Sequence, residues 1–106
     1  MAARKVVVTG TGMVTAVGLD TKSSWQALKA GTGGIATLTG FGLEGLKSTF
    51  AGQVVDFDPT SCMEPKEARK ADRFVQLAMA ASVEAMEQAG SESFDDYLAR
   101  YFAGQI

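Results

Sequence analysis

The chain has 106 residues, of which 46% are hydrophobic and 21% are charged, and its formal net charge is -2. This composition is that of an ordinary globular domain, and it excludes wholesale disorder. No apolar run approaches the roughly 20 residues that cross a bilayer, so we expect no membrane span.

The residue types that are rare or missing exclude several kinds of catalytic site. The chain has no histidine, which is the commonest general base and the commonest metal ligand in proteins. Its single cysteine, Cys62, cannot form an internal disulfide or a structural zinc site. We therefore expect no Ser-His or Cys-His catalyst, no metal, no export signal and a reducing, cytoplasmic location.

The N-terminal half predicts one strand, one helix and a long connector. From Lys5 the sequence reads KVVVTG, a β-branched run bounded by glycine that is typical of a short strand buried on both faces, and we predict a strand at residues 4–9. Asp20 stands at the position of an N-cap, before a helical pattern that should end at Gly31. Residues 31–52 hold seven of the twelve glycines and predict a loop-rich connector.

The C-terminal half predicts a second strand and two further helices. Residues 51–57 form a weaker strand pattern, closed by an Asp-Pro turn. Pro65 suits the first turn of a helix, and no Gly or Pro interrupts residues 66–89. We therefore predict one continuous helix over residues 65–89, which ends at Gly90 and lies deep in a core. Its many alanines predict that a neighbouring element approaches it closely. Residues 91–106 carry an aromatic stripe at helical spacing and predict a third helix.

Two glycine-rich motifs resemble nucleotide-binding loops only in part. Residues 10–12 read GTG after the predicted strand, but Thr15 stands where a dinucleotide fingerprint requires its third glycine. Residues 40–48 nearly match a phosphate-binding loop, but one extra residue displaces its lysine. We expect no bound cofactor. A nucleotide-binding domain is the alternative, and a thermal shift with NAD or ATP would detect it.

Cys62 is interpreted as a small, semi-buried side chain. The alternative role of nucleophile requires a neighbour that lowers the pKa of the thiol. The nearest candidates along the sequence are Lys66 and Arg69, and neither is a proper base.

A basic set is the most informative group of charges. Its members recur at i, i+3, i+4 and i+7 of the predicted helix and are Lys66, Arg69, Lys70 and Arg73. The set is either a solvated face, with ion pairs worth about 0.2–0.5 kcal/mol each, or a docking surface for an acidic macromolecule. The first cations of a helix that begins near Pro65 would each cost on the order of 0.3–1 kcal/mol, so helix stability alone does not select them. Nucleic acid is the poorer partner, because the chain is acidic overall.

Four blocks of sequence resemble, in order, the N-terminus of the β-ketoacyl-acyl carrier protein synthase II family of condensing enzymes. They read RKVVVTGTGMVTAVG, SSWQALKAGTGGI, FAGQVVDFDP and KEARKADRFVQLAMAASVEAMEQAG. The resemblance covers residues 4–90 and implies an α/β chain, the N-terminal portion of a thiolase-like layered αβαβα fold. It leaves residues 91–106 as a tail that does not match and that we expect to be helical.

The resemblance implies an acyltransferase of fatty acid synthesis, which pairs as a homodimer and elongates acyl chains by decarboxylative Claisen condensation with malonyl-acyl carrier protein. The family's chemistry uses one cysteine and two histidines, and none of them falls within residues 1–106. Cys62 does not match the family cysteine, because its context is Thr-Ser-Cys-Met. We therefore assign no catalytic residue and expect this chain alone to be inactive.

The resemblance also implies a binding role for three basic residues. Lys66, Arg69 and Lys70 match the family's cationic patch that receives the acidic helix of acyl carrier protein. Two functions are thus kept as alternatives: the N-terminal part of a condensing enzyme, or a non-catalytic module for carrier-protein docking or assembly. Elements cut from a larger layered fold leave apolar faces open, so we also expect self-association or contact with the remainder of the synthase.

Overall fold

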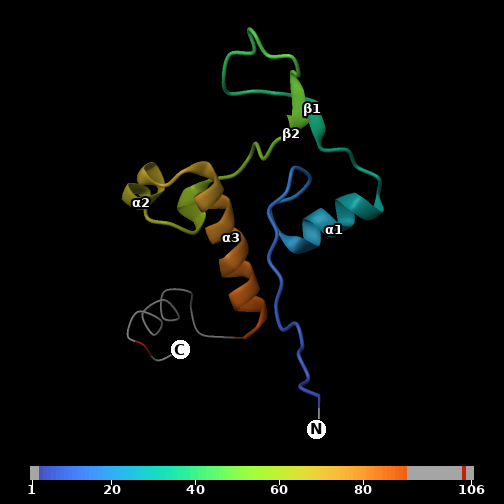
Figure 1. Ribbon diagram of the computed structural model, residues 1–106, viewed down its shortest axis with the longest axis vertical. Helices are drawn as coiled ribbons and strands as arrows, with labels where there is room; N and C mark the ends of the chain where they lie inside the picture. Colours follow the sequence, from blue (N-terminus) through green and yellow to red (C-terminus); the bar gives the residue numbers. More distant parts are fainter. Residues whose placement is uncertain (1–2, 91–103, 105–106) are drawn as a thin grey trace.

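A computed structural model of the chain describes residues 3–90 and residue 104 (Figure 1). The predicted tail helix therefore lies outside the described residues. In chain order, the elements are α1 (Thr21–Lys29), β1 (Ile35–Thr37), β2 (Phe50–Gly52), the 3-10 helix η1 (Pro59–Ser61), α2 (Pro65–Lys70) and α3 (Arg73–Gln88).

Helix α1 begins and ends as the sequence predicts. The Asp20 side chain accepts a hydrogen bond from the Ser23 backbone N–H at 2.7 Å, and the Ser23 hydroxyl accepts one from the Asp20 N–H at 3.3 Å. This reciprocal capping box satisfies two backbone donors at the start of the helix. Gly31 follows the last turn with φ 72°, the left-handed conformation that favours glycine.

Strands β1 and β2 form a two-stranded antiparallel sheet within the predicted connector. Ile35 lies opposite Gly52 and Thr37 opposite Phe50. After β2 the Gln53 side chain takes over, because its Nε2 donates to the Thr39 carbonyl at 2.9 Å. The backbone pairing that defines a strand ends at Gly52, so the predicted strand at 51–57 is wrong after that residue.

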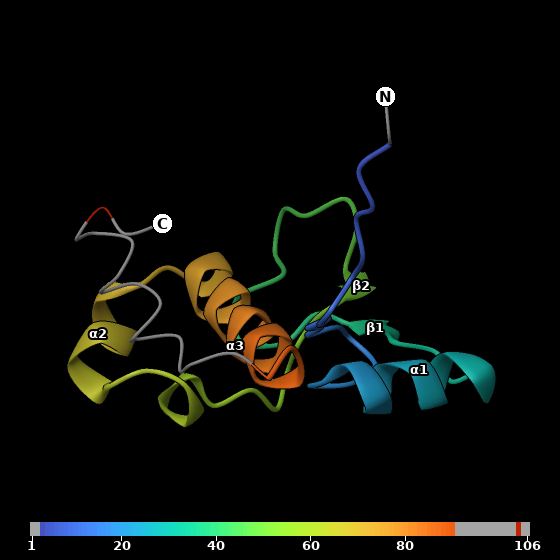
Figure 2. The same ribbon diagram turned by 90° about the horizontal axis from the view of Figure 1, so that it is seen from below.

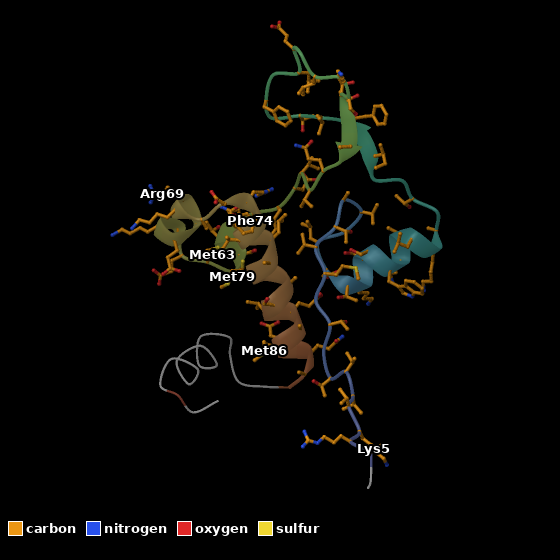
Figure 3. The ribbon with its side chains drawn as sticks, viewed as in Figure 1. Lys5, Met63, Arg69, Phe74, Met79 and Met86 are labelled. Atoms are coloured by element: carbon orange, nitrogen blue, oxygen red, sulfur yellow. The ribbon has the colours of Figure 1, made fainter. Side chains whose placement is uncertain are left out.

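The predicted strand at residues 4–9 is wrong for the described structure. A strand requires a neighbour for its backbone hydrogen bonds, and within residues 3–90 no element pairs with this segment. Val6, Val7 and Val8 are 91%, 76% and 82% exposed. The segment extends past the C-terminal end of α3, where Figure 3 labels Lys5, and the chain comes close to α3 from Gly10 onward, before it reaches α1 (Figures 1 and 2).

The predicted continuous helix over 65–89 is also wrong, because the backbone is extended at two residues. Ala71 has ψ 137° and Asp72 has ψ 158°, so α2 ends before them and α3 begins after them. Asp72 occupies the N-cap position of α3, where aspartate is favoured, although its side chain makes no capping bond. The predicted C-terminal end is confirmed, since Gly90 has φ 71°.

Helix α3 does not lie deep in a core, contrary to the prediction. None of its side chains is fully buried, and Phe74 near its start is 71% exposed. Among the described residues the buried side chains are Ala68 of α2 and Ser24 of α1. The Ser24 hydroxyl lies 2.9 Å from the Thr15 hydroxyl, so this buried polar group is satisfied. The described elements are too few to cover both faces of α3.

The described helices also bear on membrane insertion. None of those within residues 3–90 combines the length and the apolar character that a membrane span needs.

Candidate functional site

Three of the four predicted cations lie together on α2. Lys66, Arg69 and Lys70 are exposed, and we call these three residues the basic surface. Ala68 lies on the opposite face of the helix and is 5% exposed, so it anchors α2 while the cations face solvent. Figure 3 shows Arg69 extending outward from α2, away from α3.

The short length of α2 changes the electrostatic cost of these cations. Arg69 and Lys70 lie in the last turn of α2, where the partial negative charge of the helix end favours a cation. The expected penalty at the positive end of the helix therefore applies only to Lys66. Arg69 also donates from Nε to the carbonyl of Pro65 at 3.3 Å, which holds the base of its guanidinium against the helix.

Arg73 is separated from the basic surface, because the break before α3 turns it elsewhere. Its Nη2 donates to the Val54 carbonyl at 3.3 Å, and its guanidinium carbon lies 5.1 Å from the centre of the Phe57 ring. Its Nη1 donates to Gln76 Oε1 at 3.2 Å. These contacts give Arg73 a structural role, so the predicted four-cation face contains three cations.

Gln76 connects the two helices, a role that the sequence does not predict. Its Nε2 donates to the carbonyl of Ala68 at 2.8 Å and to that of Ala71 at 3.4 Å. Both carbonyls belong to the C-terminal end of α2, where backbone acceptors lack partners within the helix. No sequence signal marks this role, because it exists only where a continuous helix is broken.

A groove of about 680 Å³ lies beside α2, between the η1 region and α3. Met63, which precedes α2, and Met79 of α3 line it and are labelled in Figure 3, and Glu64 and Glu87 are among its polar residues. Within the part of the chain that the structure describes, no three His, Cys, Asp or Glu side chains gather closely enough to hold a metal ion.

Cys62 lines the same groove as a half-buried thiol, which confirms its interpretation as a small, semi-buried side chain. Its Sγ lies 3.6 Å from the carbonyl oxygen of Pro59. Burial raises the pKa of the Cys62 thiol above its usual value, and the nearby Asp58 carboxylate raises it further. The reactive thiolate is therefore disfavoured at neutral pH, which is the opposite of what a nucleophile requires.

The GTG motif at residues 10–12 serves close packing. A Cβ at Gly10 would overlap the backbone of Ala85, and one at Gly12 would overlap that of Ala81. This confirms that the alanines of α3 admit a close neighbour. The amides beside the glycines are already bonded, Thr11 N–H to Gln88 Oε1 at 2.6 Å and Met13 N–H to a Glu84 oxygen at 2.9 Å. A phosphate would have to displace these side chains.

The arrangement of the described elements is similar to that of a larger protein of known structure. It is similar to the solved structure "The ishigamide ketosynthase/chain length factor" with a TM-score of 0.77 and 33% sequence identity, over 90% of this chain and 23% of that chain. The α/β class and the N-terminal portion of a thiolase-like fold are thereby confirmed.

The family follows from a second comparison. The family description "Beta-ketoacyl synthase, N-terminal domain" matches residues 3–104, and the chain belongs to this family. This match continues past Gly90. The division of the chain into a ketoacyl synthase segment at 4–90 and a helical tail at 91–106 stays a prediction.

Curated relatives agree with this membership. The chain is 43% identical over 100 residues to 3-oxoacyl-[acyl-carrier-protein] synthase 2 of Vibrio harveyi, covering 94% of this chain and 24% of that protein. It is 40% identical over 92 residues to the protein of the same name from Coxiella burnetii, covering 87% of this chain and 22% of that protein. The chain thus spans about a quarter of the length of these relatives.

Proposed function

We propose that the chain is the N-terminal part of a fatty-acid-synthesis condensing enzyme and that it supplies a docking surface for acyl carrier protein. The enzyme's reaction would be the decarboxylative Claisen condensation of an acyl-enzyme with malonyl-acyl carrier protein. The observation that carries the proposal is the basic surface, Lys66, Arg69 and Lys70, which is exposed on one short helix. The names of the relatives, which contain the carrier protein, support the choice of partner.

The charge arrangement suits an acidic helical partner. Residues 66–70 hold three cations and Glu67, which gives a local net charge of +2 on a chain whose net charge is -2. Such a patch accelerates encounter with a partner of opposite charge and fixes its orientation, and both effects weaken as salt screens the charges. Arg69 adds a planar group with several donors, which pairs with carboxylates through two hydrogen bonds.

The chain's own residues support docking rather than catalysis. It has no histidine, and the pKa of its one thiol is raised. We therefore assign it no catalytic residue, no cofactor and no metal ligand. Its single cysteine fits a reducing compartment, and we propose a cytoplasmic location.

The exposed apolar side chains support an assembly with more of the synthase. Val6, Val7, Val8 and Phe74 are each more than two thirds exposed, and this much apolar surface is unusual for a stable monomer. We propose that the remainder of the synthase covers these faces, since the relatives are about four times as long as this chain. In its absence, association between copies is expected, and light scattering on the purified chain would measure it.

A non-catalytic docking or assembly module is the second candidate function, and the same basic surface favours it. The two candidates differ in the chemistry of the whole protein. An assay of the separate chain with acyl donor and malonyl-acyl carrier protein should give no condensation product in either case. Turnover that survives Cys62→Ala would contradict both.

Charge reversal tests the docking function directly. The Lys66→Glu/Arg69→Glu variant should bind Vibrio harveyi acyl carrier protein at least about tenfold more weakly than the unchanged chain, with a flatter dependence on salt. The matched control is Lys22→Glu/Lys47→Glu, which alters net charge equally at two exposed residues away from α2. Equal affinities for the two variants would contradict the proposal.

A further inference from the structure

The orientation of α2 depends on contacts outside the helix. With six residues, α2 is far shorter than the roughly 12–15 that make an isolated helix even marginally stable. Its buried residue is Ala68, and η1 is the described element that it contacts most. A small anchor of this kind fixes position poorly, so polar contacts must determine where the cations point.

Gln76 makes those contacts from the first turns of α3. Its amide nitrogen donates to Ala68 O at 2.8 Å and to Ala71 O at 3.4 Å, at the C-terminal end of α2. Ala68 O receives a second, longer bond from the Ala71 N–H at 3.4 Å. The half-buried amide therefore replaces the helical partners that these carbonyls lose where the chain becomes extended.

The amide oxygen of Gln76 is held by a second set of contacts. It accepts a hydrogen bond from Arg73 Nη1 at 3.2 Å. The same guanidinium donates to Val54 O and lies over the Phe57 ring. A chain of contacts thus runs from the segment after β2, through Arg73, to Gln76 and the end of α2. These contacts fix the orientation of the Gln76 amide, because only one orientation gives its oxygen a donor and its nitrogen an acceptor.

Gln76 and Arg69 also border the same shallow pocket, together with Pro59 and Pro65. The side chain that fixes the end of α2 is therefore close to the cation that extends outward from it. A rotation of α2 about Ala68 would move Lys66, Arg69 and Lys70 together, because one turn and a half of helix carries all three.

We propose that Gln76 is a positioning residue for the carrier-protein docking surface. It holds α2 in the orientation that presents Lys66, Arg69 and Lys70 as one surface, and it does so without touching the partner. The inference rests on the docking function proposed above. It predicts that loss of the Gln76 bonds weakens binding by reorienting these three cations rather than by unfolding the chain.

The test is a double-mutant cycle on the full chain, with Vibrio harveyi acyl carrier protein as the probe. Gln76→Met keeps the length of the side chain and removes its hydrogen bonds. It should weaken binding about three- to tenfold, the effect of one or two hydrogen bonds on an equilibrium. In the Arg69→Glu background the same substitution should weaken binding by a smaller factor than in the unchanged chain, because one of the three cations that Gln76 orients is already gone.

Controls separate positioning from stability. Thr21→Val removes a hydrogen bond between α1 and Glu84, far from α2, and should lower the unfolding midpoint while leaving affinity unchanged. Should Gln76→Met fail to unfold cooperatively, Gln76→Asn serves in its place. Its shorter polar side chain cannot span the same carbonyls, and it should give the same pattern of binding.

Each outcome decides a different claim. Unchanged affinity of the Arg69→Glu variant would overturn the docking function. Weakened binding by Arg69→Glu together with unchanged binding by Gln76→Met would overturn the positioning role alone. Equal weakening by Gln76→Met in both backgrounds would also overturn it, because Gln76 would then act independently of Arg69.

Discussion

Gly12 lies against the backbone of Ala81, so closely that a Cβ on the glycine would overlap the alanine carbonyl. The contact joins the N-terminal segment to the middle of α3, across 69 positions of sequence. Gly10 repeats the contact one turn further along the helix, at Ala85. Two glycines and two alanines thus let an extended segment run along a helix at the smallest separation that side chains allow.

Substitution of Gly12 tests this contact. Gly12→Ala should lower the free energy of unfolding by about 1–3 kcal/mol, because the methyl group forces the segment away from α3. Gly33→Ala is the matched control, since its Cβ would meet no atom within 4 Å and its backbone is not in the left-handed region. Urea denaturation of both variants measures the difference. Equal stability of the two would show that the segment does not pack on α3 in solution.

Glu84 should stabilise the same junction through its carboxylate. It accepts from the Met13 N–H at 2.9 Å and from the Thr21 N–H and hydroxyl at 3.1 and 2.7 Å. Glu84→Leu should lower the free energy of unfolding by about 1–3 kcal/mol, because the Met13 N–H and the two part-buried donors of Thr21 lose their acceptor. Glu87→Leu, at an exposed position of the same helix, should change it far less. Similar losses measured for both by thermal denaturation would contradict the assignment.

The charge of Asp20 should make the stability of α1 depend on acid pH. Hydrogen bonds from the Ser23 side chain and backbone hold the pKa of Asp20 below its usual 3.8. Because the pKa of Asp20 is lower in the folded chain, the ionised carboxylate stabilises the fold at any pH above the unfolded-state pKa. This contribution is lost as pH falls through the folded-state pKa.

Asp20→Asn provides the comparison, because asparagine still caps a helix but carries no charge. The difference in unfolding midpoint between the two chains should be constant above about pH 5 and should decrease as pH falls below 3.8 and through the lower folded pKa of Asp20. A difference that persists unchanged through this range would contradict the pKa shift.

Cys62 should react slowly with alkylating agents at neutral pH. Burial, and then the Asp58 carboxylate, raise the thiol pKa above the ordinary 9.0, so the thiolate fraction is small. The iodoacetamide rate should rise with pH to a midpoint above 9.0, and Asp58→Asn should lower that midpoint. A midpoint below 9.0 would indicate an activated thiol. Because the pKa of Cys62 is higher in the folded chain, the protonated thiol stabilises the fold fully below pH 9.0. This contribution is lost as pH rises through the folded-state pKa.

Local signals explain which parts of the fold the sequence predicted correctly. The Asp20 cap, the glycines after α1 and α3, and the first-turn position of Pro65 depend on conformations of neighbouring residues only. Such features are determined within one turn of chain. The alanines of α3 predicted a close neighbour for a similar reason, because small side chains allow close approach by any segment that packs there.

Contacts between distant segments explain what the sequence did not predict. The break at Ala71 and Asp72 follows no Gly or Pro, and its carbonyls are satisfied by Gln76 from the next helix. The strand expected at 4–9 had the right composition, but a strand also needs a partner, which composition does not supply. The helical spacing grouped Arg73 with Lys66, Arg69 and Lys70, whereas the structure separates it from them.

The most direct test of the docking surface is to map where the carrier protein binds. Isotope-labelled chain would be titrated with unlabelled Vibrio harveyi acyl carrier protein, and the amide chemical shifts would be followed by NMR. We predict that the largest shifts lie at Lys66–Lys70, that they decrease as salt is added, and that α1 shows none. Shifts confined to residues outside α2, or none at millimolar carrier protein, would contradict the account.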